Sequence, residues 1–486
     1  MTSKFTKIVA TISDKRCDVP FLQQLFDEGM NVVRLNSAHL DIAGFDKIVQ
    51  NVRAVSNHIA LLVDTKGPEV RTTANENGEA IQLKTGDTIK IMGNPAQLST
   101  RECVCVSYPN FATDLKIGDN ILFDDGEIDL QVVEKRSDYL LCEVMNDGAL
   151  GSRKSVNVPG VRINLPSLTE KDRVSIDYCI KNDIDFIAHS FVRNKHDLLA
   201  IQKILNEHQS PIKIIAKIEN QEGVDNIDEI LEYAYGVMIA RGDLGIEVAQ
   251  EKIPGIQRML IRKCVLAHKP VIVATQMLHS MIEHPRPTRA EITDIANAIY
   301  YRTDALMLSG ETANGKYPVE AVRTMAKVAH EAELTKMSEN DIPIHYDDDG
   351  FDTMSFLAKA AVSANDLLGT KMTITDSLTG MTARTLAAYR AKKPVIAICY
   401  EERTTRLLAL SYGVFPIYQE QKDSSREYFF CAIKKLLRDE WLTQDDFISY
   451  LSGSQGIGGG TTFIEINQVR KMLQSIRRTT LVGMEK

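Results

Sequence analysis

Short apolar runs rich in β-branched residues recur along this chain of 486 residues, and a helix-length segment follows most of them. Strands that are apolar on both faces and alternate with helices are typical of a parallel sheet. Eight β/α units within about 230 residues, once one insertion is set aside, favour a (β/α)8 TIM barrel over an open sheet. The predicted strands are residues 7–12, 31–36, 59–63, 185–191, 213–218, 236–240, 270–275 and 304–308.

The insertion separates the third and fourth predicted strands and differs in character from the rest. Turn pairs such as Asn77-Gly78 and Asp125-Gly126 punctuate short strands of alternating polarity, of which 128–133 is one. This pattern predicts an all-β domain. We therefore assign residues 72–166 to an inserted β domain, and residues 1–71 and 167–340 to the barrel that it interrupts.

A polar stretch at 335–350, with an acidic run at 347–349, predicts a solvated linker after the barrel. The β/α alternation then resumes, with strands near 371–375, 394–399 and 414–418. A helix near 425–442 would carry the only tryptophan, Trp441. We predict a separate α/β domain over 350–486.

Composition argues against several classes of protein. No apolar run approaches the ~20 residues that span a membrane, and residues 1–15 lack the apolar core of a secretory signal, which indicates the cytoplasm. The net charge is −8 and the Lys and Arg residues are dispersed, which disfavours a nucleic-acid partner. Eight cysteines are too sparse for a disulfide scaffold, so we expect reduced thiols.

Polar residues stand at the carboxyl ends of five predicted strands, the ends that form the active-site face of a parallel barrel. These residues are Arg34 and Asn36, Asp64, Lys217 and Glu219, Asp243, and Thr275. Any one of them alone is explained by a solvated strand end or a local ion pair. Their convergence on one concave mouth predicts a ligand, because so many polar groups need a partner that offsets their desolvation.

The residue types at this mouth indicate the chemistry. Two carboxylates from adjacent strands, Glu219 and Asp243, suit a hard divalent cation such as Mg²⁺, which takes its other ligands from water and a phosphorylated substrate. Arg34, Arg71 and Lys217 would then bracket the phosphate, the arginines as bidentate forks and the lysine as a point charge. The combination predicts phosphoryl transfer.

The same strand-end motifs resemble those of the pyruvate kinase family, in that family's order. They are 31–36 (NVVRLN), 64–71 (DTKGPEVR), 216–220 (AKIEN), 240–245 (ARGDLG), 274–278 (ATQML), 286–291 (RPTRAE) and 307–312 (MLSGET). The resemblance covers essentially the whole chain. It implies a catalytic barrel, a β-barrel lid at 72–166, a C-terminal regulatory α/β domain and assembly as a homotetramer.

The resemblance also implies an activity: phosphoryl transfer from phosphoenolpyruvate to ADP, which gives pyruvate and ATP in the last step of glycolysis and depends on Mg²⁺ or Mn²⁺. Lys217 would stabilise the charge on the transferring phosphoryl group and the enolate, and Glu219 and Asp243 would hold the metal. The residues that would position phosphoenolpyruvate are Arg34, Lys217, Gly242, Asp243 and Thr275, of which Arg34, Lys217 and Thr275 would be catalytic. The nucleotide would meet Asn36, His39, Arg71 and Lys154.

The family binds a monovalent cation beside the phosphate, which here would use Asn36, Asp64 and the carbonyl of Thr65. The chain departs from the family at one ligand, because Ala38 replaces a serine and removes its hydroxyl. A water molecule or Ser37 is the expected substitute. Glu69 is the residue that accompanies potassium dependence in this family, and we therefore predict activation by K⁺.

The C-terminal domain resembles the family's effector domain. Ser377, Thr379, Gly380 and Thr382 match its phosphate-binding turn, at a helix start that suits anions. Basic residues of some relatives are absent from this turn, so the resemblance implies a phosphorylated allosteric effector without identifying it; fructose 1,6-bisphosphate is one candidate. A glycine-rich run at 456–460 is either a phosphate-cradling loop or a plain turn.

Two other functions compete with this hypothesis. One is a different Mg²⁺-dependent barrel enzyme that uses phosphoenolpyruvate or pyruvate, and the insertion after Arg71 together with Lys217 argues against it. The other is a catalytically dead barrel that senses phosphorylated metabolites. The complete set of Lys217, Glu219, Asp243 and Thr275 disfavours such a sensor.

Overall fold

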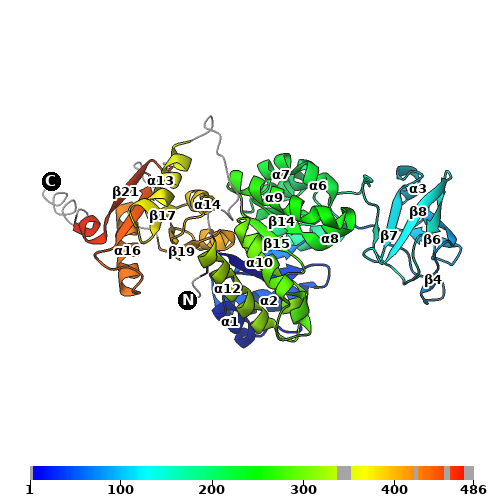
Figure 1. Cartoon of the computed structure of the whole chain (residues 1–486), viewed down its shortest axis with the longest axis horizontal. Coiled ribbons are helices and arrows are strands. Elements are labelled where there is room, and N and C mark those ends of the chain that lie inside the picture. The colour runs from blue at the N-terminus through cyan, green and yellow to red at the C-terminus, as the bar shows by residue number, and fades with distance from the viewer. Residues whose placement is uncertain (1–3, 337–351, 421–424, 454–459, 475–486) are drawn as a thin grey trace.

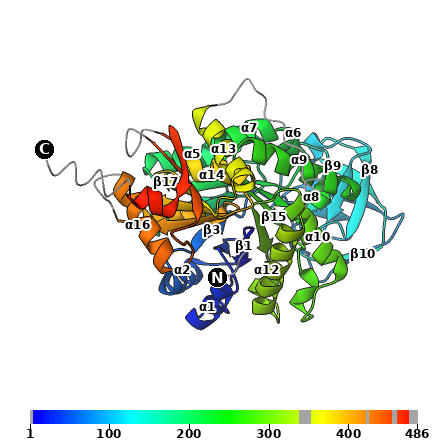
Figure 2. The same cartoon turned by 60° about the vertical axis from the view of Figure 1, so that its left-hand side comes forward.

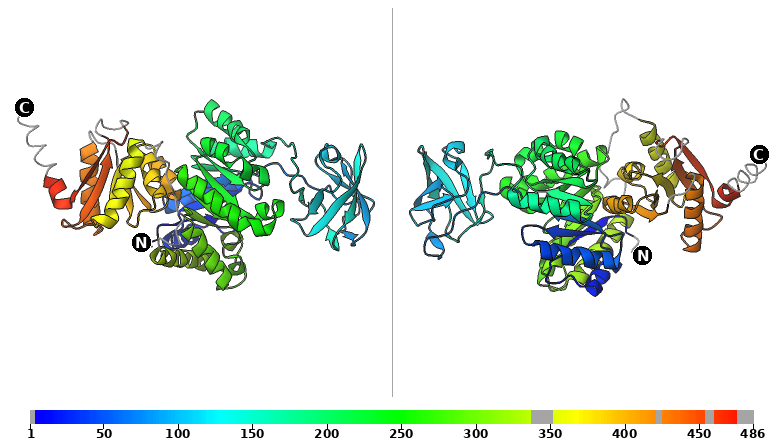
Figure 3. Two further views of the ribbon diagram at one scale, coloured as in Figure 1. Left: turned by 45° about the horizontal axis from the view of Figure 1, so that its top comes forward. Right: turned by 180° about the vertical axis from the view of Figure 1, so that it is seen from behind.

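Three parts of the chain lie in a row in this computed structural model, with the barrel in the centre, the insertion at one end and the C-terminal part at the other (Figures 1 and 3). The structure describes residues 4–336, 352–420, 425–453 and 460–474. The predicted acidic run at 347–349 and the glycine-rich run, apart from Gly460, lie outside the described residues. Within the described ranges, every helix is too short or too polar to cross a membrane.

The central part is a closed barrel of eight parallel strands, as the alternation predicts. Around the barrel the strands run in the order β1-β16-β15-β14-β13-β12-β3-β2. Their bounds are β1 (Lys7–Thr11), β2 (Val32–Asn36), β3 (Ala60–Asp64), β12 (Phe186–His189), β13 (Lys213–Ile218), β14 (Gly236–Ala240), β15 (Val271–Ala274) and β16 (Ala305–Leu308).

Helices surround the barrel and bury one face of every strand. They are α1 (Val19–Asp27), α2 (Ile42–Val55), α4 (Glu170–Lys181), α5 (Lys195–Glu207), α6 (Gln221–Asp225), α7 (Ile227–Tyr233), α8 (Arg241–Glu247), α9 (Ile253–Leu266), α10 (Arg289–Tyr300), α11 (Gly310–Ala313) and α12 (Pro318–Thr335), with short 3₁₀ turns at Gln250–Lys252 and His279–Ile282. Thr288 and Glu291 form a capping box that fixes the start of α10.

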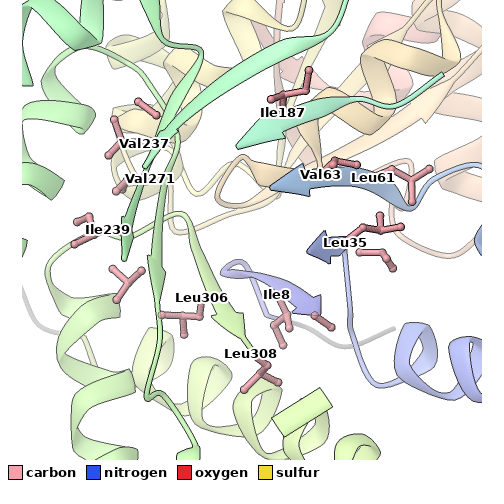
Figure 4. Close-up of a cluster of buried hydrophobic side chains, with 14 of the residues drawn as sticks. Ile8, Leu35, Leu61, Val63, Ile187, Val237, Ile239, Val271, Leu306 and Leu308 are labelled. Atoms are coloured by element: carbon pink, nitrogen blue, oxygen red, sulfur yellow. The ribbon is translucent and has the colours of Figure 1, made fainter. Parts of the chain in front are cut away.

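Side chains alternate between two apolar layers along each barrel strand. Residues such as Ile8, Leu61 and Val237 belong to the cluster shared with the helices (Figure 4). Their strand neighbours, such as Val9 and Leu62, belong to a separate cluster that fills the barrel. Because side chains alternate with a period of two, the inward set decides which residues reach the barrel mouth.

The insertion has its own core and two sheets. Six strands run in the order β11-β7-β8-β9-β5-β6, and β10 pairs with β4. The elements are β4 (Ile81–Leu83), β5 (Thr88–Gly93), β6 (Cys103–Val106), α3 (Phe111–Asp114), β7 (Asn120–Phe123), β8 (Ile128–Lys135), β9 (Tyr139–Val144), β10 (Gly148–Leu150) and β11 (Val156–Asn157). Gly148 begins β10, where a Cβ atom would lie 2.6 Å from Ile128.

The C-terminal part is a five-stranded sheet, β19-β18-β17-β20-β21, in which only β20 and β21 pair antiparallel. Its elements are α13 (Thr353–Leu367), β17 (Thr373–Ser377), α14 (Met381–Ala388), β18 (Val395–Cys399), α15 (Glu402–Leu407), a 3₁₀ turn (Leu408–Leu410), β19 (Val414–Tyr418), α16 (Ser425–Arg438), β20 (Phe447–Ser452) and β21 (Phe463–Gln468).

One predicted boundary in this part is wrong. The helix expected to continue to residue 442 ends at Arg438, because Glu440 adopts a left-handed conformation with φ of 58°. The backbone N–H of Trp441 then donates to the Leu436 carbonyl at 2.9 Å, which closes the helix end. Trp441 therefore lies after the helix and packs against Phe415.

The C-terminal part covers the amino end of the barrel, where β1 begins (Figure 2). Leu407 and Leu410 join the apolar cluster inside the barrel. Arg406 is buried there, and its guanidinium donates to Asp185 at 2.7 Å and to Asp183 at 2.6 Å. The carboxyl end of the barrel faces the insertion.

This buried contact yields a stability prediction. The side chains of Arg406 and Asp185 are 4% and 0% exposed, so Arg406→Met leaves the buried carboxylate of Asp185 with only the longer ion pair to Arg53, at 3.4 Å. We expect the variant to lose about 3–5 kcal/mol of unfolding free energy, measured by urea denaturation. The same substitution at Arg438, whose pair with Asp439 is exposed, should cost less than about 1 kcal/mol. Equal losses in the two variants would contradict the assignment.

Candidate active site

The inward set of side chains changes from apolar to charged at the carboxyl end of the barrel. Arg34 follows Val32 on β2, Asp64 follows Leu62 on β3, and Lys217 follows Ile215 on β13, each two residues further along its strand. Glu219 comes two residues after Lys217. All four charged residues are buried.

Lys217 lies at the centre of this group. Its Nζ atom is 2.9 Å from Glu219 Oε1 and 3.2 Å from Asp64 Oδ2, and it donates to Ser190 Oγ at 2.8 Å. Arg34 pairs with the same oxygen of Asp64 and donates to Thr11 Oγ1 at 3.1 Å. The side chain of Asp64 thus links the two cations.

These contacts fix the protonation of the lysine. Burial alone would lower the pKa of Lys217, but the carboxylates of Asp64 and Glu219 outweigh burial and raise that pKa. Burial would likewise raise the pKa of Asp64, and Arg34 and Lys217 reverse the effect and lower it. The structure therefore holds a charged ammonium group at the barrel mouth.

Glu219 and Asp243 form a carboxylate pair that lacks a full counter-charge. Burial raises the pKa of Glu219, Lys217 opposes this rise, and the nearby charge of Asp243 adds to it. The backbone N–H of Phe191 also donates to Glu219 Oε2, at 2.7 Å. Two hard oxygen donors close enough to interact electrostatically fit a divalent cation such as Mg²⁺. No group of three or more His, Cys, Asp or Glu side chains arranged to hold a metal ion occurs among the described residues.

A second group of oxygen atoms fits a monovalent cation. Ser37 Oγ and Asp64 Oδ1 are both buried, and neither has a hydrogen-bond partner. The two residues are adjacent, since the backbone N–H of Ser37 lies 3.4 Å from the Asp64 carbonyl. Of the other expected ligands, Asn36 Oδ1 accepts from the Ala38 N–H and the Thr65 carbonyl accepts from Ser190 Oγ. The Ser37 hydroxyl is thus available where the Ala38 side chain has none.

Thr275 and Gly242 are joined directly. The backbone N–H of Gly242 donates to Thr275 Oγ1 at 2.8 Å. Thr275 has a φ of 68°, a left-handed conformation that is rare for a β-branched residue. This conformation brings the end of β15 against the start of α8, which also carries Asp243.

A cavity of about 380 Å³ lies between the barrel mouth and the insertion, and both Asp243 and Arg71 line it. Arg71 is held by Glu69 at 2.6 Å and by the Arg153 carbonyl at 2.9 Å. The other residues expected at the nucleotide are placed differently. Lys154 pairs with Asp124 inside the insertion and does not line this cavity, His39 is exposed, and Asn36 is half-buried.

The expected effector turn is formed at the start of α14. Gly380 has a φ of 81°, and its N–H donates to Ser377 Oγ at 2.9 Å. Thr382 Oγ1 hydrogen-bonds to Thr461 Oγ1 at 2.7 Å. The side chain of Thr379 is exposed and its carbonyl accepts from Arg384.

Sequence reasoning missed three contacts in the site, which come from Ser190, Thr11 and the N–H of Phe191. Ser190 could have been found, because it stands two residues after the inward-facing Ala188. The N–H of Phe191 could not, since β12 ends at His189 and not at residue 191. Phe191 takes a φ of 56°, and this turn aims its N–H at Glu219.

Comparisons with known proteins agree with this geometry. Residues 3–322 match the pyruvate kinase barrel domain and residues 355–467 match the pyruvate kinase alpha/beta domain. The chain is 45% identical to a pyruvate kinase of Borreliella burgdorferi, over 98% of this chain and 99% of that one. It is 40% identical to a pyruvate kinase of Clostridium acetobutylicum, over 96% and 99% of the two chains.

A solved structure gives the same result. The crystal structure of a pyruvate kinase from Cryptosporidium parvum is 36% identical and superposes with a TM-score of 0.90, covering 96% of this chain and 97% of that one. The similarity extends over the barrel, the insertion and the C-terminal part. On sequence and on structure, the chain belongs to the pyruvate kinase family.

Proposed function

We propose that the carboxyl end of the barrel is where the chain transfers the phosphoryl group of phosphoenolpyruvate to ADP, giving pyruvate and ATP. The observation that carries the proposal is the charged Lys217, buried between Asp64 and Glu219 with its Nζ atom fixed by three contacts. Phosphoryl transfer needs little covalent chemistry from a protein, and catalysis comes mostly from positioning and charge stabilisation. A fixed ammonium group in a dry site supplies both.

Lys217 and Arg34 would both contact the phosphate of phosphoenolpyruvate. Lys217 offers a point charge to the oxygens of the transferring phosphoryl group and to the enolate oxygen that forms as the phosphoryl group leaves. Arg34 is held by Asp64 and Thr11, so its fork is already oriented before substrate arrives. This preorganisation lowers the cost of reorganisation during the reaction.

Glu219 and Asp243 would hold Mg²⁺ or Mn²⁺. When bound, the divalent ion would neutralise charge on the substrate phosphate and carboxylate oxygens. The backbone of Gly242, with Asp243 and Thr275, would position phosphoenolpyruvate against Lys217. Thr275 would stand near the carbon that takes a proton as the enolate becomes pyruvate.

The insertion would act as a lid over residues 72–166. Its hinge carries Arg71, which already lines the cavity beneath it and would contact the nucleotide phosphates with Asn36 and His39. Lys154 would join them by exchanging its contact with Asp124, which holds it at 2.7 Å. Closure would exclude water, so that the phosphoryl group passes to ADP and is not hydrolysed.

Asn36, Asp64 and Thr65 would bind K⁺, with Ser37 in place of the hydroxyl missing at Ala38. The unpartnered Ser37 Oγ and Asp64 Oδ1 support this assignment, because buried polar atoms without partners are costly. When bound, K⁺ would supply positive charge beside the substrate phosphate.

The remaining proposals concern regulation and assembly. Ser377, Thr379, Gly380 and Thr382 would receive the phosphate of an allosteric effector at the start of α14. The ordered Gly380 turn supports this site, although Thr382 would have to exchange its contact with Thr461. As a glycolytic enzyme the chain would act in the cytoplasm, as a homotetramer.

The role of Lys217 is tested by Lys217→Met in an assay of ADP-dependent pyruvate formation. Removing the ammonium group while keeping the bulk of the stem should lower kcat by about 10²–10³-fold. Lys181→Met, at a lysine on α4 whose side chain is 68% exposed, serves as the matched control and should retain the wild-type rate. Undiminished activity in Lys217→Met would remove the role of this lysine, and absence of pyruvate formation by the wild type would overturn the proposed function.

The metal assignment is tested by Glu219→Gln in a titration with Mg²⁺. Losing one charged donor should raise the Mg²⁺ concentration needed for half-maximal activity by roughly tenfold to a hundredfold. Glu222→Gln is the control. Glu222 lines the same cavity, but it pairs with Arg162 at 4.0 Å and is not one of the proposed metal ligands. An unchanged Mg²⁺ requirement in Glu219→Gln would place the metal elsewhere.

The monovalent site is tested by comparing rates in K⁺ and in tetramethylammonium, which is too large for a cage of protein oxygens. The enzyme should be faster in K⁺, and Ser37→Ala should raise the K⁺ concentration for half-activation by about two- to tenfold while leaving the Mg²⁺ requirement unchanged. Equal rates in the two salts would rule out K⁺ activation.

A further inference from the structure

The turn after β15 is unusual and needs external support. Thr275 and Gln276 both take left-handed conformations, with φ of 68° and 55°. A β-branched residue rarely adopts this conformation, and such a residue persists only where the surrounding structure holds it. Thr275 is also the residue whose hydroxyl contacts the Gly242 backbone at the substrate site.

The support comes from the side chain of Arg241. Its Nη2 donates to the Thr275 carbonyl at 2.6 Å, and its Nε donates to the Ala274 carbonyl at 3.3 Å. The Thr275 hydroxyl itself donates to that same Ala274 carbonyl at 2.6 Å. One guanidinium therefore holds both carbonyls of the strained turn.

Asp294 on α10 fixes this guanidinium from the other side. Both carboxylate oxygens of Asp294 accept from Arg241 Nη1, at 2.7 and 2.9 Å. The side chain of Arg241 is only 11% exposed and that of Asp294 is 35% exposed, so water reaches the pair mainly from the Asp294 side. A lysine could keep the charge but could not bridge two carbonyls and a carboxylate in one plane.

We propose that Arg241, oriented by Asp294, is a positioning residue that acts through Thr275. Arg241 directly precedes Gly242, whose N–H donates to the Thr275 hydroxyl. The side chain of Arg241 donates to the Ala274 carbonyl, which also accepts from the Thr275 hydroxyl. Arg241 thus sets where that hydroxyl stands relative to Gly242 and Asp243. The inference rests on the proposed function, since it assigns Arg241 to the phosphoenolpyruvate site.

The experiment measures two reactions in Arg241→Lys and Asp294→Asn. The first is pyruvate formation, with kcat and the KM values for both substrates. The second is the exchange of pyruvate methyl protons for deuterium in D₂O with Mg²⁺, followed by NMR, which reports on the carbon expected near Thr275. We expect kcat and the exchange rate to fall together by about tenfold to a hundredfold, with the KM for ADP changed less than about twofold.

Controls separate positioning from folding. Arg173→Lys, at an exposed arginine of α4, should leave both reactions unchanged. Thermal unfolding shows whether each variant is folded at the assay temperature, and Asp294→Asn replaces Arg241→Lys if the latter is not. In a Thr275→Ala background, Arg241→Lys should cause almost no further loss, because residues that act as one unit are not additive.

The outcomes are distinguishable. The positioning role alone would be overturned if a folded Arg241→Lys or Asp294→Asn variant exchanged pyruvate protons at the wild-type rate. It would also be overturned if Arg241→Lys lowered the rates by the same factor in the Thr275→Ala background as in the wild type. A wild-type enzyme that forms no pyruvate would overturn the proposed function as well. The role would be supported if Arg241→Lys lowered both kcat and the proton-exchange rate in the wild-type background but lowered neither further in the Thr275→Ala background.

Discussion

The buried charges at the barrel mouth are the constraint on which the rest of the site depends. Two buried cations, Arg34 and Lys217, face the buried carboxylates of Asp64 and Glu219 and the half-buried carboxylate of Asp243. Such groups leave water only if they satisfy one another, and here one negative charge remains in excess. That excess explains why burial and Asp243 together raise the pKa of Glu219. The same excess favours the binding of a divalent cation, and the bound cation would in turn favour the binding of a phosphate.

The barrel separates this charged end from a structural end. At the carboxyl end, the insertion and the mouth enclose a cavity of about 380 Å³. At the amino end, Leu407 and Leu410 plug the interior, and the Arg406 pair with Asp185 locks the C-terminal part in place. The strands are the rigid connection between the two ends. A signal from the C-terminal part would therefore reach the site through the strands, and not by direct contact.

Periodicity carried most of what the sequence could predict. Eight apolar runs predicted the eight barrel strands, and the polar residues at their carboxyl ends predicted that Arg34, Asp64 and Lys217 meet at one mouth. Periodicity could not predict where the backbone turns. The helix predicted to 442 ends at Arg438 because of the left-handed Glu440, and the turn at Phe191 brings an N–H to Glu219. The contact between Arg241 and Asp294 joins residues 53 positions apart, and no local pattern marks it.

The excess negative charge at the mouth would bind a divalent cation beside Lys217. The most direct measurement is anomalous diffraction from crystals grown with Mn²⁺ and oxalate, a planar dianion that stands in for the enolate of pyruvate. We expect the strongest peak between the carboxylates of Glu219 and Asp243, with oxalate completing the coordination and Lys217 Nζ in contact with oxalate. A metal bound elsewhere, with Glu219 still paired only to Lys217 and the Phe191 N–H, would contradict this assignment.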